Sequence, residues 1–152
     1  MIIAPHEVHE GNINRLQRLF PKSILLSEID RANLSEMEVL IIDSMGKLSS
    51  VYQYGDVAFV GGGFGKGIHN LLEPAAFGLP TFFGSNFEKF EEAKQLIELK
   101  GAFSVKNSED FIKKMSELHD EIPKGEISKQ FVLDNRGATE KIISKFSFTS
   151  IP

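Results

Sequence analysis

Short apolar runs recur along the chain and alternate with segments whose apolar residues are spaced to form one face of a helix. Within each run the side chains are apolar throughout instead of alternating with polar ones, which is typical of parallel strands buried on both faces of a sheet. Six strands are predicted, at Ile2–Ala4, Ser23–Leu26, Val39–Ile42, Val57–Val60, Thr81–Phe83 and Ala102–Val105.

Helical spacing fills most of the intervals between these strands, whereas the polar segment Ser27–Glu36 is predicted as a loop. Asn86 is the expected N-cap of the helix that follows it, and Gly101 is the residue expected to close that helix. Helices are predicted at Glu7–Phe20, Leu48–Tyr54, Leu71–Phe77 and Phe87–Leu99, from Asn107 or Ser108 to Leu118, and near Glu126–Asn135 and Thr139–Phe146.

Alternation of strands and helices predicts an α/β fold. We expect a Rossmann-like, doubly wound six-stranded parallel sheet with strand order 3-2-1-4-5-6, in a single domain spanning residues 1–152. The first strand follows Met1 without a lead-in, which favours a start inside a longer protein over a native start.

The composition of the chain excludes several classes of function. The net charge of −4 gives no electrostatic footprint for nucleic acid, and no apolar run reaches the length of a membrane span. The absence of cysteine excludes a disulfide framework and a Cys nucleophile, and it fits a cytoplasmic protein. His6 and His9 lie three residues apart without an evident third ligand, so neither a metal nor a cofactor is expected.

The loop after the fourth predicted strand holds five glycines within the seven residues Gly61–Gly67. Glycine permits positive φ and lets a ligand approach backbone N–H groups closely, so a phosphate-binding loop and a tight structural turn both fit. No Gly-Lys-Ser/Thr follows, which excludes a Walker A loop. The candidate phosphate contacts are Gly62, Gly63, Gly65 and Gly67, and Lys66 could add positive charge.

Ligands of open α/β sheets bind beyond the carboxyl ends of the strands, where the strand order reverses. In the expected order this point lies between the first and fourth strands. Pro5 and His6, which follow the first strand, should therefore meet the glycine-rich loop.

A carboxylate stands close behind that loop, in the segment Asn70–Pro74. One interpretation is a capping box, in which Asn70 caps a helix and Glu73 occupies its third position. The other is a ligand contact, since the two oxygens of Glu73 could accept bonds from two adjacent hydroxyls such as those of a ribose.

The segment Phe59–Ala93 resembles the signature of the 3-deoxy-D-manno-octulosonic acid (Kdo) transferases. The family pattern has a Gly-rich loop followed by four elements, which stand here as His69-Asn70, Glu73-Pro74-Ala75, Gly78-Leu79-Pro80 and, after Gly84, Asn86-Phe87. Upstream, Ile42–Leu48 is similar to the family's Asp-Thr-Met-Gly-Glu-Leu element, with Lys47 in place of Glu. The first loop is similar to Ala-Pro-Arg-His, but His6 follows Pro5 and the usual Arg is missing.

This resemblance implies the nucleotide-binding C-terminal half of a GT-B glycosyltransferase. The implied donor is CMP-Kdo, and the implied acceptor is a lipid A precursor of lipopolysaccharide biosynthesis, held by an N-terminal domain that this chain lacks. That domain would supply the catalytic carboxylate, so the chain alone should be inactive, and the complete enzyme should work at the cytoplasmic face of the inner membrane. The implied nucleotide contacts are Pro5, His6, Ser44, Met45, Gly46, Gly62, Gly63, Gly65, Gly67, Asn70 and Glu73.

Other functions remain open at this stage. A glycine-rich loop followed by Glu-Pro also fits another GT-B sugar-nucleotide transferase, an epimerase or a non-catalytic nucleotide-binding domain. An NAD-dependent dehydrogenase is disfavoured, because its GxGxxG loop should follow the first strand, where Pro5 and His6 stand instead.

Overall fold

The computed structural model describes residues 1–31, 33–65, 67–118 and 124–145. The chain divides into two compact units, Met1–Val51 and Tyr52–Pro152, and each is described by itself. Both contain parallel strands connected through helices, so the predicted α/β class is confirmed.

The first unit is built on a three-stranded sheet of β1 (Ile2–Ile3), β2 (Ser23–Leu25) and β3 (Val39–Ile41), in the order β1-β3-β2. The predicted order 3-2-1 is therefore wrong, because β3 and not β2 is central. The side chain of Ile41 is fully buried in this position. The apolar run that contains β3 is uninterrupted, whereas β2 begins with a serine, and this difference was a usable signal for the central strand.

The helices of this unit are α1 (Glu10–Leu19), η1 (Leu26–Arg31), η2 (Leu34–Glu36) and α2 (Leu48–Val51). The Nδ1 atom of His9 accepts a 3.1 Å hydrogen bond from the Asn12 N–H, so α1 begins three residues later than predicted. The two 3-10 helices occupy most of the segment predicted as a loop. The core is formed by Ile13, Val39 and Ile41, with Ile3, Val8, Leu16, Phe20 and Leu25 packed against them.

The second unit is built on a three-stranded sheet of β4 (Ala58–Phe59), β5 (Thr81–Gly84) and β6 (Ala102–Val105). Its order β4-β5-β6 is as predicted. Six strands are thus present, but in two three-stranded sheets, and the single six-stranded sheet is not confirmed.

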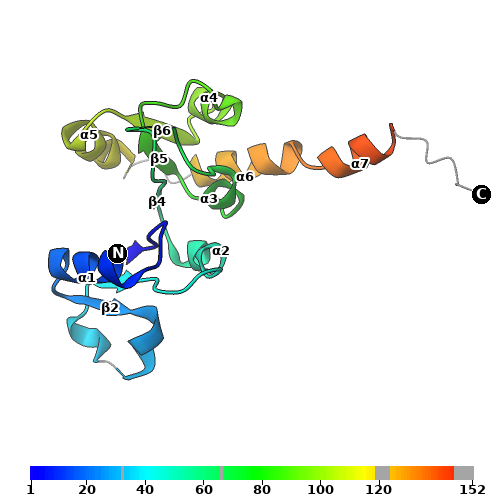
Figure 1. Cartoon of the computed structure of the whole chain (residues 1–152). Helices are drawn as coiled ribbons and strands as arrows, with labels where there is room; N and C mark the ends of the chain where they lie inside the picture. The colour runs from blue at the N-terminus through cyan, green and yellow to red at the C-terminus, as the bar shows by residue number, and fades with distance from the viewer. Residues whose placement is uncertain (32, 66, 119–123, 146–152) are drawn as a thin grey trace, which may run out of the picture. The chain divides into compact units, whose positions relative to one another are not determined.

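Helices cover both faces of this second sheet (Figure 1). Phe83 packs on one face with residues of α3 (Leu72–Ala76), α4 (Glu91–Glu98) and α6 (Lys124–Asp134). The neighbouring Phe82 packs on the opposite face with α5 (Ser108–Leu118). Two buried faces explain why apolar residues occupy successive positions of these strands instead of alternating with polar ones. The remaining elements are η3 (Tyr52–Tyr54) and α7 (Ala138–Ile143).

Two predicted ends of α4 are wrong. The helix starts at Glu91 with Phe90 as its N-cap, because Asn86 is bonded elsewhere. At the other end Lys100, not Gly101, has the left-handed conformation, with a φ of 61°. Glycine is required at position 101 for another reason, since a Cβ there would lie 2.6 Å from the Ser128 hydroxyl oxygen of α6.

Among the described residues, no helix has both the length and the apolar character needed to cross a bilayer. The last helix was predicted to reach Phe146, which lies outside the described residues.

Candidate functional site

The glycine-rich loop of the second unit folds back on itself. The N–H of Gly63 donates to the carbonyl of Gly67 at 2.8 Å, and the N–H of His69 donates to the carbonyl of Gly61 at 3.2 Å. The conformation needs positive φ at Gly62, Gly63 and Gly67, with values of 87°, 68° and 143°. The predicted structural turn is therefore real.

Most of these glycines are also required by close packing. A Cβ on Gly63 would lie 2.7 Å from the backbone of Gly84, and a Cβ on Gly67 would lie 2.9 Å from the ring of Phe90. Gly65 differs, because no described atom lies within 4 Å of the position its Cβ would take. The fold explains why Gly62, Gly63 and Gly67 are glycines. It does not explain Gly65, where the approach of a ligand would. Lys66 lies outside the described residues.

The turn after β5 holds the loop in place. The backbone N–H of Asn86 donates to the carbonyl of Gly63 at 2.7 Å, and its side-chain Nδ2 donates to the carbonyl of Gly65. Since β4 and β5 are adjacent and parallel, the two loops leave the same edge of the sheet. Asn86 was predicted as a helix cap, and this contact to the loop was not foreseen.

Asn70 and Glu73 form a local pair at the start of α3. The Oδ1 atom of Asn70 accepts from the N–H of Leu72 at 2.9 Å, and its Nδ2 donates to Oε1 of Glu73 at 3.0 Å. Asn70 thus bonds to the first N–H of this helix from the position before its N-cap, Leu71, and Glu73 binds the side chain of Asn70 and not its backbone N–H as in a capping box. Glu73 is exposed, and its Oε2 accepts a hydrogen bond from no described residue.

Tyr52 is close to this pair. Its ring contacts that of Phe77, with centroids 5.9 Å apart. Burial raises the pKa of the Tyr52 phenol above its ordinary value, and the negative charge of Glu73 raises it further. Tyr52 therefore remains protonated near neutral pH, next to the carboxylate that is the predicted hydroxyl contact.

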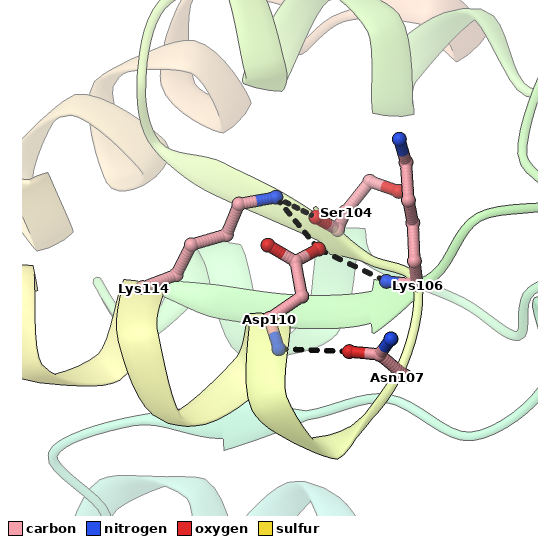
Figure 2. A network of polar contacts seen from close by, with 5 residues as sticks. All are labelled: Ser104, Lys106, Asn107, Asp110 and Lys114. Atoms are coloured by element: carbon pink, nitrogen blue, oxygen red, sulfur yellow. Dashed lines mark hydrogen bonds and ion pairs between the residues drawn. The ribbon is translucent and has the colours of Figure 1, made fainter.

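A network of polar contacts fixes the carboxyl end of β6 (Figure 2). The carboxylate of Asp110 accepts from the Lys106 N–H at 3.0 Å and from the Lys114 ammonium at 3.1 Å, and that ammonium also donates to the Ser104 carbonyl at 2.6 Å. These bonds lower the pKa of Asp110. The network joins the carboxyl end of β6 to α5 and holds the two elements together.

In the first unit, two loops with predicted contacts also share one sheet edge. Because β1 and β3 are adjacent and parallel, Pro5 and His6 leave the same edge as Ser44, Met45 and Gly46. Met45 is 76% exposed, and Gly46 has a φ of 77° with open space where a Cβ would stand. The predicted meeting of Pro5 and His6 with the glycine-rich loop remains a prediction.

Asp43 lies two residues after the end of β3. Its Oδ1 accepts from the N–H of Ser27 at 3.1 Å, and its Oδ2 accepts from the hydroxyl of the same serine. The side chain therefore ties β3 to η1, and it stabilises this edge of the first sheet. In the described residues no group of three or more histidine, aspartate or glutamate side chains could hold a metal ion.

No protein-family model matches the chain. A 3-deoxy-D-manno-octulosonic acid transferase of Aquifex aeolicus is 40% identical over 85 residues, covering 55% of this chain and 24% of the relative. The enzyme of the same name from Haemophilus influenzae is 34% identical over 113 residues, covering 70% of this chain and 26% of the relative. The predicted resemblance to the Kdo transferase family is confirmed.

Two further similarities bear on the fold and on the function. The crystal structure of the C-terminal CMP-Kdo binding domain of WaaA from Acinetobacter baumannii matches with a TM-score of 0.71 and 22% identity, covering 88% of this chain and 73% of that domain. The fold is thus Rossmann-like, as predicted for the C-terminal half of a GT-B fold. A bifunctional glycosyltransferase/methyltransferase of Fusobacterium nucleatum is 29% identical over 152 residues, covering 95% of this chain and 23% of the relative. The chain spans about a quarter of the length of these curated relatives.

Proposed function

We propose that this chain is a nucleotide-sugar-binding domain, residues 1–152, of a longer Kdo transferase. In this proposal it holds CMP-Kdo while Kdo is transferred to a lipid A precursor. The similarity to the Aquifex and Haemophilus transferases supports the reaction, and the similarity to the CMP-Kdo binding domain of Acinetobacter WaaA supports the donor. The length of the relatives supports a longer enzyme.

The observation that carries the proposal is that the glycine-rich loop has backbone N–H groups without a partner among the described residues. The backbone N–H groups of Phe64 and Gly65 donate to no described residue, and the space beside the Gly65 Cα is open. Unpaired N–H groups in a glycine-rich turn are donors suited to the oxygens of a phosphate. We assign the phosphate of the donor to this loop.

The ribose of the nucleotide is assigned to Glu73. One of its oxygens is bound by Asn70, and the second is left for hydroxyl groups of a ligand. The helix itself contributes little charge, because α3 has only five residues and its Leu72 N–H is already bonded to Asn70. The phosphate is therefore assigned to the loop N–H groups and not to the N-terminus of this helix.

Transfer breaks the bond between the sugar and the phosphate of CMP-Kdo, and negative charge grows on the phosphate that leaves. N–H groups that are already oriented stabilise such charge. The acceptor hydroxyl needs a general base, which we assign to the N-terminal part of the longer enzyme at the cytoplasmic face of the inner membrane. The chain alone should bind the nucleotide without transferring Kdo.

A second candidate is a glycosyltransferase that uses a different sugar nucleotide. The Fusobacterium relative supports it, because the similarity extends over 95% of this chain and the name of that relative specifies no Kdo transfer. Both candidates place the nucleotide in the same loop, and they differ in the base and in the number of phosphates.

Titration of the chain with CMP, UMP, UDP and NAD separates these candidates. The expected result is saturable binding that is tightest for CMP, measured by calorimetry or by changes in NMR chemical shifts. Preference for UDP would favour the second candidate, and preference for NAD or no binding of any nucleotide would overturn the proposal.

A further inference from the structure

Asn86 contacts the glycine-rich loop at two points. Its backbone N–H donates to the Gly63 carbonyl at 2.7 Å, and its side-chain amide donates to the Gly65 carbonyl. The asparagine itself is exposed, and its side-chain bond links positions 21 residues apart in the sequence. Because the Asn86 side chain is exposed, its amide could form its hydrogen bonds with water. Its bond to the loop is therefore not needed merely to satisfy a buried polar group.

The two bonds fix the orientation of peptide groups. In a trans peptide the C=O and the N–H point in opposite directions, so a carbonyl held on one side turns the N–H of the next residue to the other side. The Gly63 carbonyl points at Asn86, and the N–H of Phe64 in the same peptide group therefore points away from Asn86. That N–H is one of the two unpaired donors to which the phosphate is assigned.

We propose that Asn86 is a positioning residue for phosphate binding. Its backbone N–H holds the Gly63 carbonyl and thereby orients the Phe64 N–H, and its side-chain amide holds the Gly65 carbonyl away from the ligand. This inference rests on the proposed function, because it assumes that the loop receives a phosphate. It assigns a role to a residue that contacts the loop and not the ligand.

A comparison of CMP with cytidine tests the role, since the two ligands differ only in the phosphate. Asn86→Ala removes the side-chain bond to Gly65 and keeps the backbone N–H. Without that bond the Gly65 carbonyl is free to turn its negative end toward the phosphate. We therefore expect this variant to lose about tenfold in CMP affinity, while its cytidine affinity stays unchanged. Both affinities are read by NMR titration, together with a thermal melt.

Asn135→Ala is a matched control, because the Asn135 side-chain amide also donates to a backbone carbonyl, that of Phe131 in α6 at 2.9 Å. It should leave the ratio of CMP to cytidine affinity unchanged. Equal losses for the two ligands in Asn86→Ala, or no loss for either, would overturn the positioning role alone. A wild-type chain that does not prefer CMP to cytidine would overturn the phosphate assignment and this inference with it.

Discussion

Gly63 and Gly84 pack backbone against backbone, and a Cβ on Gly63 would lie 2.7 Å from the Cα of Gly84. Gly63 also has a φ of 68°, a conformation that other residues adopt at a cost. We therefore expect Gly63→Ala to lower the free energy of unfolding by about 1–3 kcal/mol, from crowding and from backbone strain together. Urea denaturation followed by circular dichroism measures this loss. A variant as stable as the wild type would show that the two loops do not pack as described.

Gly65 provides the contrasting substitution. Its φ is outside the left-handed region, and no described atom lies within 4 Å of the position of a Cβ. Gly65→Val should therefore change the free energy of unfolding by less than about 1 kcal/mol. It should nevertheless weaken CMP binding at least tenfold, because the added methyl groups occupy the space assigned to the phosphate. Normal CMP affinity in Gly65→Val would move the phosphate away from this loop.

The Asp110 network should be visible in the acid stability of the chain. Its hydrogen bonds to Lys106 and Lys114 lower the pKa of the Asp110 carboxyl in the folded state. The resulting stability is fully present above the ordinary value of 3.8, and it is lost as the pH falls through the lower pKa of the folded state. Asp110→Asn should thus be less stable than the wild type near neutral pH, and the difference should shrink below pH 3.8.

Glu117→Gln is the control for that experiment, because Glu117 is an exposed carboxylate on the same helix with no partner among the described residues. Its stability relative to the wild type should vary little with pH. Denaturation series from pH 2 to 7 would make the comparison, and a constant difference for Asp110→Asn would contradict the network.

The predictable parts of the fold are those that depend on local sequence pattern. The strands were found because each is a mostly apolar run between Gly, Pro or polar residues, and the order β4-β5-β6 agrees with the tendency of successive strands to lie side by side. The order in the first unit was missed, because pairing between strands depends on contacts that periodicity does not encode. The uninterrupted run Val39–Ile42 was the one available sign that β3 is central.

The candidate site divides in the same way. The glycine-rich loop and Asn70 were predictable, since turn chemistry and helix capping act within a few residues. The contact of Asn86 with Gly65 spans 21 residues, and a local pattern of Asn before a helix predicted a cap there instead. The electrostatic effect of Glu73 on Tyr52 was likewise beyond local reasoning, because it depends on tertiary packing.

The Glu73 carboxylate could have a structural role or a ligand-binding role, and substitution separates the two. The first N–H of α3, that of Leu72, is bonded at 2.9 Å by Oδ1 of Asn70, an atom that Glu73 does not contact. Glu73→Ala should therefore cost less than about 1 kcal/mol in stability, below the typical loss of a helix cap. If Glu73 binds both ribose hydroxyls, the wild type should prefer CMP to deoxy-CMP, which lacks the 2′-hydroxyl, by about tenfold.

The sharper expectation is that Glu73→Ala abolishes this preference. Removal of the carboxylate lowers the affinity for CMP more than the affinity for deoxy-CMP, because deoxy-CMP lacks the 2′-hydroxyl bond to Glu73. The two affinities therefore converge. Glu10→Ala removes an exposed carboxylate from the first turn of α1 and should leave the preference intact. Calorimetric titration of the three proteins with both ligands makes the measurement. A preference for CMP that survives in Glu73→Ala would assign the ribose to another residue, and a large loss of stability with unchanged affinities would make Glu73 structural.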